Sequence, residues 1–416
     1  MNDSREENSS SHALSVITPP KAGAVAPKRV HPASLPAADV EALYVHIPFC
    51  FHKCHYCDFY SITRQTPARM EGFVDLLLRE ADFWVDARPR FRTVFFGGGT
   101  PSLLPLPSMR RLIEGLRRRF DFSALEEWTV EINPATAELD YCRMLRDSGV
   151  DRLSFGAQSF NPAELAVLER HHHPDDVARS IDIARAAGFH RLNVDLIYAI
   201  PGQDLASWAH SLEMAVSLKT PHISCYNLTY EPNTPMAVRK RLGQFIPVEE
   251  SIELQMFHEA RRRLKWRGML PYEISNYAEP GEECRHNLVY WTGGNYIGLG
   301  PSAASHVEGH RWKSRSHLGE WERAVAEGFV PTAEFEILPA ERRAGELAML
   351  MLRLAGGINY AAFTGKTGID AREAFTDQVS RFEAVGLLKA DTMSICLTET
   401  GLNVADAIGA EFLSPA

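Results

Sequence analysis

Six short apolar segments recur between residues 43 and 228, and an amphipathic segment separates each one from the next. The apolar segments have the length and composition of β-strands, whereas the segments between them carry apolar residues at the three- and four-residue spacing of helices. This alternation predicts a parallel sheet, because parallel strands need long crossover connections that are usually helical. The predicted strands are Leu43–Phe49, Thr93–Phe96, Trp128–Ile132, Arg152–Phe155, Arg191–Tyr198 and His222–Leu228.

Polar or glycine-rich sequence lies at the end of each predicted strand. In βα barrels the functional site is built at the carboxyl ends of the strands, so these positions are expected to converge on one rim of an open or closed barrel. The positions are Cys50, Cys54 and Cys57, the run Gly97–Pro101, Glu131, Gln158, Asp195, Asn227 and Thr229.

Three of the seven cysteines, Cys50, Cys54 and Cys57, have C-x3-C-x2-C spacing. Three thiolates can hold three irons of a [4Fe–4S] cluster and leave the fourth iron without a protein ligand. An open metal position is a reactive one, as in catalytic zinc sites. A zinc site that adds His52 or His55 is the alternative, and the position of the motif directly after a predicted strand favours the cluster.

This loop resembles that of the radical S-adenosylmethionine (SAM) superfamily, in which a C-x3-C-x2-C loop follows the first strand of a partial barrel. The resemblance implies an α/β fold with a TIM-like partial (β/α)6 barrel and a site for a [4Fe–4S] cluster and SAM. In that superfamily the amino and carboxylate groups of SAM chelate the open iron. An electron from the cluster then splits the sulfonium to give a deoxyadenosyl radical.

A closer resemblance covers residues 42–416 and is to the branch that contains oxygen-independent coproporphyrinogen III oxidase. It rests on YVHIPFC at 44–50, GGGTP at 97–101, RLSFGAQSF at 152–160, NVDLIYAIPG at 193–202 and EPNT at 231–234. Glycines such as those in GGGTP let a ligand approach the backbone, although a tight turn uses them equally. By motif, the resemblance implies that SAM or its neighbours are contacted by Tyr44, Tyr56, Gly98, Gly99, Thr100, Glu131, Gln158, Arg170 and Asp195.

Two features separate the oxidase from the HemW-type heme chaperones within this branch. The oxidase has a further cysteine two positions after the third ligand, where this chain has Phe59. Residues 286–291, HNLVYW, match the H-N-x-x-Y-W motif that is associated with heme binding in the chaperones. An imidazole is a common axial ligand of heme iron, so His286 is the candidate ligand. A thiolate from Cys284, or a hydrogen-bonded loop that binds no heme, is the alternative.

The resemblance therefore implies a heme chaperone that binds [4Fe–4S], SAM and heme and transfers heme to acceptor proteins, with an electron donor for its cluster. The alternative is oxidative decarboxylation of coproporphyrinogen, or another radical SAM reaction on a tetrapyrrole. Because Phe59 replaces the oxidase cysteine, we expect coproporphyrinogen oxidase activity to be absent.

The chain is expected to have four parts. Residues 1–40 are rich in Ser, Ala and Pro and lack periodicity, which predicts a disordered tail. Residues 41–310 form the predicted barrel and residues 311–330 a connector. From 331 to 416, predicted helices and two short strands, Leu387–Ala390 and Ser394–Thr398, indicate a winged-helix-like α+β domain. Residues 332–416 carry 12 acidic and 7 basic side chains, a net charge of −5, which favours a docking role over DNA binding.

The composition of the whole chain argues against nucleic acid as a partner. Lysine plus arginine, 44, against aspartate plus glutamate, 53, gives a net charge of −9, the wrong sign for phosphate contact. No apolar stretch reaches the roughly 20 residues of a membrane span, so any docking to membrane-bound acceptors would be peripheral. The absence of a recognisable export signal and the clustering of the cysteines favour a reducing compartment, the cytoplasm.

Overall fold

The structure is a computed structural model that describes residues 30–63 and 65–413. Most of the predicted disordered tail, residues 1–29, lies outside the described residues. The remainder of that prediction is wrong, because residues 30–40 pack against the barrel. Val30 and Val40 are buried in the core, and the Asn295 side-chain amide donates to the Asp39 carbonyl at 3.1 Å.

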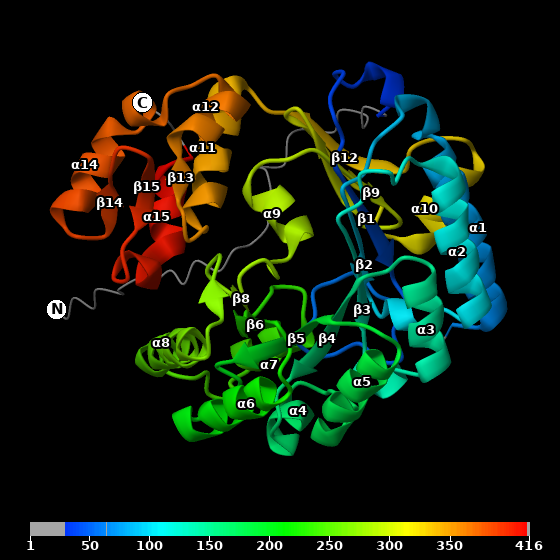
Figure 1. Ribbon diagram of the computed structural model, residues 1–416, viewed down its shortest axis with the longest axis horizontal. Helices are drawn as coiled ribbons and strands as arrows, with labels where there is room; N and C mark the ends of the chain where they lie inside the picture. The colour runs from blue at the N-terminus through cyan, green and yellow to red at the C-terminus, as the bar shows by residue number, and fades with distance from the viewer. Residues whose placement is uncertain (1–29, 64, 414–416) are drawn as a thin grey trace, which may run out of the picture.

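A sheet of twelve strands forms the body of the described chain (Figure 1). Six strands run parallel and lie side by side in sequence order, which confirms the six predicted strands and the parallel arrangement. They are β1 (Ala42–Ile47), β2 (Thr93–Gly98), β3 (Glu127–Ile132), β4 (Arg152–Gln158), β5 (Arg191–Tyr198) and β6 (His222–Asn227). The strand order does not close on itself, so the sheet is a partial barrel.

Crossover helices cover the outer face of this curved sheet. They are α1 (Pro67–Asp82), α2 (Leu106–Arg119), α3 (Leu139–Asp147), α4 (Pro162–Val167), α5 (Pro174–Ala186) and α6 (Leu205–Ser217). On β1, Leu43, Val45 and Ile47 belong to the apolar core with these helices. Because side chains alternate along a strand, Tyr44 and His46 point to the inner face. Polar side chains therefore gather inside the barrel, where a ligand can be bound.

Further strands extend the sheet beyond β1. The strand β9 (Tyr296–Leu299) pairs with β1 in parallel, and three antiparallel strands follow it. These are β10 (Ala304–Val307), β11 (His310–Ser314) and β12 (Thr332–Ile337), with α10 (Leu318–Ala326) between the last two. Residues 311–330 are therefore part of the barrel and not the predicted connector, and the C-terminal domain begins near residue 338 instead of 331. The burial of Trp321 in the main core is the physical reason.

The C-terminal domain has a winged-helix-like α+β fold, as predicted. Its elements are α11 (Ala340–Leu352), β13 (Ile358–Asn359), α12 (Tyr360–Thr367), α13 (Ala371–Ala374), α14 (Thr376–Ala384), β14 (Leu388–Ala390), β15 (Ser394–Leu397) and α15 (Ala405–Glu411). The three strands form a small sheet of their own, in the order β13-β15-β14. An apolar cluster that includes Phe363, Phe375 and Ile395 is separate from the barrel core, which makes this a distinct domain.

The part of the barrel domain between β6 and β9 contacts the C-terminal domain. It contains α7 (Pro235–Arg241), α8 (Glu250–Trp266), the short strands β7 (Leu270–Pro271) and β8 (Asn276–Ala278), and α9 (Arg285–Trp291). Figure 1 shows α9 between the inner face of the sheet and the C-terminal domain. The guanidinium of Arg353, which follows α11, lies over the Trp291 ring, 5.2 Å from its centroid. The helix α9 therefore contacts both domains.

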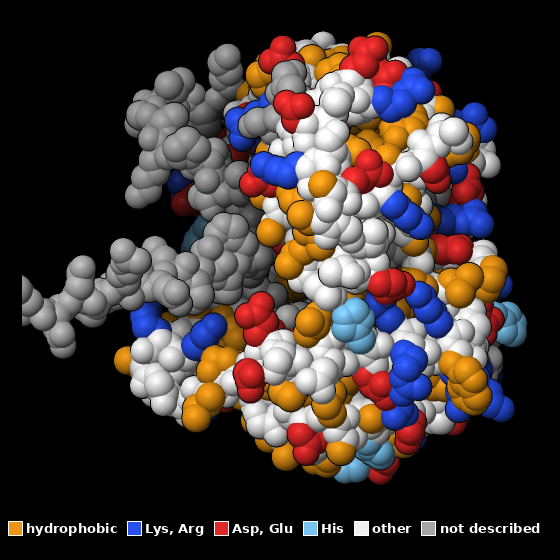
Figure 2. All heavy atoms as spheres, turned by 90° about the vertical axis from the view of Figure 1, so that its left-hand side faces the viewer, with side chains coloured by type: hydrophobic (Ala, Val, Ile, Leu, Met, Phe, Trp, Pro, Cys, Tyr) orange, Lys and Arg blue, Asp and Glu red, His pale blue; other side chains and the backbone are white. Residues whose placement is uncertain are grey.

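Two surface properties bear on possible partners. Figure 2 shows acidic and basic side chains interspersed over the face that it presents, so the described residues there form no continuous basic surface for a phosphate backbone. None of the helices in residues 30–63 and 65–413 is both long and apolar enough to cross a bilayer.

Candidate functional site

The cluster loop, residues 50–59, follows the carboxyl end of β1. The Cys50 amide donates to the Ile62 carbonyl at 2.9 Å, and the Cys57 amide donates to the Cys54 carbonyl at 3.2 Å. All three cysteines are free and partly exposed. Among the described residues, no three His, Cys, Asp or Glu side chains converge as they would on a single metal ion. A [4Fe–4S] cluster makes no such demand, because each thiolate binds a different iron.

The carboxylate of Glu169 holds the cluster loop from the side. It lies 2.7 Å from Nε2 of His52 and 3.0 Å from Nε2 of His55. The other ring nitrogen of His55 is 3.2 Å from Nη1 of Arg239 on α7, and the His55 carbonyl accepts from the Met236 amide at 3.0 Å. The histidines of the zinc alternative are thus engaged with Glu169 and not with the thiols.

Arg170 joins the cluster loop to β4. Its Nη2 donates to the Gly156 carbonyl at 2.6 Å, and its Nη1 lies 3.8 Å from the sulfur of Cys54. The buried Nε of Arg170 has no partner among the described residues. A cationic side chain beside a thiolate stabilises the charged form, so the position of Arg170 is consistent with its predicted role beside the cluster and SAM.

The glycines at the end of β2 are required by contacts within the protein. Gly98 has φ +103°, and a Cβ there would lie 2.5 Å from the His46 ring. A Cβ at Gly99 would lie 2.7 Å from the Phe49 carbonyl oxygen. The sequence predicted that these glycines let a ligand approach the backbone or form a tight turn. The space that a side chain would need is filled by β1 and the start of the cluster loop, so close packing explains both glycines, and the approach of a ligand stays a prediction.

Two carboxyl groups, those of Glu131 and Asp195, lie on the inner face of the barrel. The pKa of Glu131 is raised to about 8, because the group is buried and Asp195 is nearby, although the Gly98 amide donates to it. Asp195 accepts from the Ser154 hydroxyl at 2.9 Å and from the Asn193 side-chain amide at 2.8 Å. Within the described part of the chain, neither carboxylate forms an ion pair with Lys or Arg. An ammonium group of a ligand would supply the missing positive charge.

Tyr44 and His46 form a chain of hydrogen bonds behind the cluster loop. The Tyr44 hydroxyl lies 3.1 Å from Nδ1 of His46, and Nε2 of His46 lies 2.8 Å from the Tyr60 carbonyl. Burial lowers the pKa of His46 to about 4, so the ring is neutral. It follows that Nε2 donates to the Tyr60 carbonyl, which fixes the segment after the third cysteine to β1.

The other predicted SAM residues lie on the same rim. Tyr56 packs with a small apolar cluster below the cluster loop, and burial raises its pKa well above the ordinary value. The hydroxyl of Thr100 lies 3.7 Å from the sulfur of Cys50. Gln158 has φ +64°, at a register shift between β4 and β5. A non-glycine residue in this left-handed region is strained, which is common at binding sites.

His286, the candidate heme ligand, is fully buried at the other end of the strands. Its Nδ1 is hydrogen-bonded to the Thr93 hydroxyl at 2.9 Å and its Nε2 to the Tyr290 hydroxyl at 2.8 Å. Burial lowers the pKa of this imidazole to about 4. Thr93 begins β2, whereas the cluster loop follows the carboxyl end of β1. The structure therefore does not bring His286 to the cofactor rim, and neither ring nitrogen is open.

Glu127 fixes the first turn of α9 at this end of the barrel. Its carboxylate accepts from the backbone amides of Arg285 and His286, both at 3.1 Å. The thiol of Cys284 donates to the same carboxylate at 3.4 Å and is fully buried. Burial also raises the pKa of Cys284 to about 12, which disfavours the thiolate ligand considered as an alternative. Arg191 completes the network through ion pairs with Glu127, Asp151 and Glu282.

Sequence comparison decides the family. The sequence model described as the radical SAM superfamily matches residues 44–215, and the HemN C-terminal domain matches residues 338–404. The heme chaperone HemW of Lactococcus lactis is 32% identical over 374 residues, which cover 89% of this chain and 96% of the relative. The chain belongs to the HemW family. The Mycobacterium tuberculosis HemW is 35% identical over 88% of this chain and 93% of its own length.

The solved structures support the fold of this HemW-family chain. The coproporphyrinogen III oxidase HemN of Escherichia coli, named as a radical SAM enzyme, matches with a TM-score of 0.79 and 22% identity over 92% of each chain. At this identity the match is informative about the fold alone. It agrees with the partial barrel and the C-terminal domain described above.

The inner rim of this HemW-family chain fits the cofactors of the radical SAM superfamily. The three free thiols could hold the cluster, and the two uncompensated carboxylates, Glu131 and Asp195, could receive the ammonium and hydroxyl groups of SAM. The sequence analysis did not identify two residues that lie next to this site, His46 and Glu169. His46 lies within YVHIPFC and so offered a signal, whereas Glu169 offered none because it is 117 residues from its partner His52.

Proposed function

We propose that this protein is a heme chaperone, which binds heme and transfers it to acceptor proteins. The observation that carries the proposal is the similarity to proteins named heme chaperone HemW. Three of these relatives are 31–39% identical to this chain, and the matches span 70–99% of their own lengths. Phe59, in the position of the fourth oxidase cysteine, and the HNLVYW segment at 286–291 support it.

The cofactor site would consist of this chain's own groups at the rim. Cys50, Cys54 and Cys57 would hold the cluster, which supplies an electron to the sulfonium of SAM when both are bound. Glu131 and Asp195 would bind the polar groups of SAM. The remaining members of the proposed SAM site are Tyr44, Tyr56, Gly98, Gly99, Thr100, Gln158 and Arg170.

Heme ligation by His286 requires a change in α9. In the described arrangement Tyr290 occupies Nε2 and Thr93 occupies Nδ1. The hydrogen bond to Tyr290 is within one turn of the same helix, so it can break without loss of the contacts that Glu127 makes with the start of α9. We therefore propose Nε2 as the ligand atom, made available when the Tyr290 hydroxyl moves away.

Heme titration of the anaerobically reconstituted protein tests this proposal. We expect a Soret shift for the parent chain, tighter binding by Tyr290→Phe because Nε2 is then free, and a different spectrum for His286→Ala. Tyr360→Phe, in the C-terminal domain, is the matched control and should behave like the parent. No Soret shift in the parent would overturn heme binding. Identical titrations of parent, Tyr290→Phe and His286→Ala would overturn the ligand assignment alone.

The chaperone proposal also needs an electron donor and an acceptor. Phe51 and Phe59 on the cluster loop are 73% and 65% exposed, so a donor protein could approach the cluster from that side. We place the protein in the cytoplasm, since seven free cysteines suit a reducing compartment, and we place any contact with membrane-bound acceptors at the membrane periphery. The rival activity is tested by anaerobic assay, in which we expect no conversion of coproporphyrinogen to protoporphyrinogen.

A further inference from the structure

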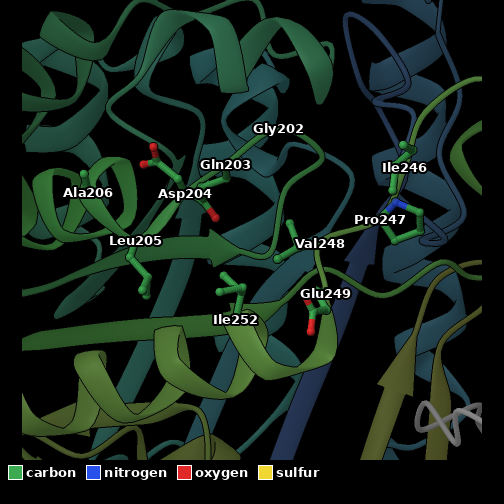
Figure 3. A pocket seen from close by; sticks show the side chains of 10 residues that line it. All are labelled: Gly202, Gln203, Asp204, Leu205, Ala206, Ile246, Pro247, Val248, Glu249 and Ile252. Atoms are coloured by element: carbon green, nitrogen blue, oxygen red, sulfur yellow. The ribbon is translucent and has the colours of Figure 1, made fainter.

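An apolar groove lies between the first turns of α6 and α8, with a cavity volume of about 510 Å³ (Figure 3). Leu205 comes from α6 and Ile252 from α8, and Val248 comes from the segment that precedes α8. In Figure 3 the side chains of Val248 and Ile252 lie in the middle of the view, Leu205 lies at the left below Asp204, and Glu249 lies beside Ile252. The groove is thus apolar in its centre and acidic at its edge.

The wall of the groove presents an exposed apolar side chain in a fixed position. Ile246 is 87% exposed, and Leu242 nearby in the sequence is 64% exposed. The neighbouring Phe245 is held in place by the Tyr230 ring, with the two centroids 5.7 Å apart. The Gln244 amide donates to the Arg239 carbonyl at 3.0 Å. Single exposed apolar side chains are common on protein surfaces, and Ile246 is relevant here because it borders the apolar lining of the groove.

The acidic side chains at the edge of the groove determine which partner charge is favoured. Asp204, Glu249 and the adjacent Glu250 are exposed, and the residues that line the groove include no Lys or Arg. Of the three basic residues that end α7, Arg239 contacts His55 and Lys240 lies over the Tyr230 ring, whereas Arg241 is exposed and does not line the groove. The edge therefore favours a basic partner, and it repels anionic lipid headgroups.

A small apolar cluster connects the segment that precedes Ile246 with the cluster loop. That cluster contains Leu168, Ile197, Ile200, Leu228 and Met236, with Tyr56 and Phe245 packed against it. Tyr56 belongs to the cluster loop, and Phe245 precedes Ile246. The segment that carries Ile246 follows α7 and is hydrogen-bonded to it through Gln244, and α7 contacts the cluster loop through His55.

We propose that the groove binds an amphipathic segment of an acceptor protein, with apolar side chains on Leu205, Ile246 and Ile252 and basic side chains at Asp204 and Glu249. This inference rests on the proposed transfer of heme to acceptor proteins. Apolar contact supplies affinity at the centre of such a surface, and the charges at its edge supply selectivity.

Two labelled synthetic helical peptides test the groove by fluorescence anisotropy. They share one pattern of leucines and differ in whether the polar face carries lysine or glutamate. The lysine peptide should bind the parent chain, and the glutamate peptide should bind at least about tenfold more weakly. The double variant Asp204→Asn with Glu249→Gln keeps the helix cap and should lose about fivefold in affinity for the lysine peptide.

The variant Ile246→Asp distinguishes apolar binding in the groove from nonspecific electrostatic attraction of the peptide. It adds a negative charge, so nonspecific attraction of the lysine peptide would increase, whereas loss of the apolar contact should weaken binding about tenfold. Trp266→Asp is the matched control, because Trp266 is 78% exposed and ends α8, about 24 Å along the helix from its first residue. The control should bind like the parent.

Several results would overturn the proposal. The first two are equal binding of both peptides by the parent, and unchanged or tighter binding of the lysine peptide by Ile246→Asp. The others are binding of phosphatidylglycerol vesicles in place of the peptide, and a dimer of the parent chain that dissociates in Ile246→Asp. Heme titration of Ile246→Asp distinguishes the two proposals, since that variant should bind heme like the parent. If the parent binds the peptide and not heme, the groove stands and the chaperone proposal fails.

Discussion

The imidazole of His286 and the hydroxyl of Thr93 are hydrogen-bonded at 2.9 Å, which ties α9 to the first residue of β2. This contact spans 193 residues of sequence and lies in the buried interior of the barrel. Glu127 holds the same helix through two backbone amides, and Arg353 reaches it from the C-terminal domain. The HNLVYW segment thus has a structural role in the heme-free chain in addition to any role as a ligand.

Replacement of His286 by alanine should destabilise the protein by about 2–4 kcal/mol, because it leaves a cavity and removes the partners of the Thr93 and Tyr290 hydroxyls. Urea denaturation at pH 7 measures the change. His171→Ala is the control: that residue is exposed, and its replacement should change the free energy of unfolding by less than about 0.5 kcal/mol. Equal stability of the two variants would contradict the structural role of His286.

The same imidazole should make the protein acid-sensitive. In the unfolded chain its pKa is near 6.5, whereas burial lowers the folded pKa to about 4. The unfolded state therefore takes up a proton first, and stability falls as the pH drops from 6.5 to 4, by about 3 kcal/mol from this residue. The measurement compares parent and His286→Gln across that range. A variant that loses as much stability as the parent would show that His286 does not contribute.

Glu169 should slow the loss of the cluster. Glu169→Gln weakens two contacts with His52 and His55, both partly exposed, so the expected effect is modest. After reconstitution, iron release to a chelator should become about threefold faster. Glu71→Gln, an exposed change on α1, should release iron at the parental rate. If Glu169→Gln releases iron at the same rate as the parent, the cluster loop is held by its other contacts.

SAM binding should strengthen as the pH rises toward 8. The buried carboxyl of Glu131 has a pKa of about 8, and it attracts the ammonium group of SAM in its ionised form. Binding at neutral pH should therefore release a proton from Glu131, and this release should be absent in Glu131→Gln, which should also bind SAM about tenfold more weakly. Calorimetry in buffers of different ionisation enthalpy measures both effects. Equal proton release by parent and variant would exclude Glu131 as the source.

Local pattern was sufficient for the strands and the cluster loop. The alternation of apolar segments with amphipathic ones reports burial directly, and the three cysteines lie within eight residues of one another, so neither prediction depended on distant contacts. The strands β11 and β12 were missed because their side chains are largely polar. Arg311 is ion-paired across the strands with Glu336, and this pairing is invisible until the two segments lie side by side.

The sequence alone therefore determined the six parallel strands and the position of the cysteines after the first one, because these follow from periodicity and spacing. Tertiary structure alone decided that Glu169 holds the cluster loop, that Glu131 and Asp195 lie near each other without an ion pair among the described residues, and that both ring nitrogens of His286 are engaged. Hydrogen-bond partners and desolvation depend on which distant groups become neighbours, and no local pattern contains that information.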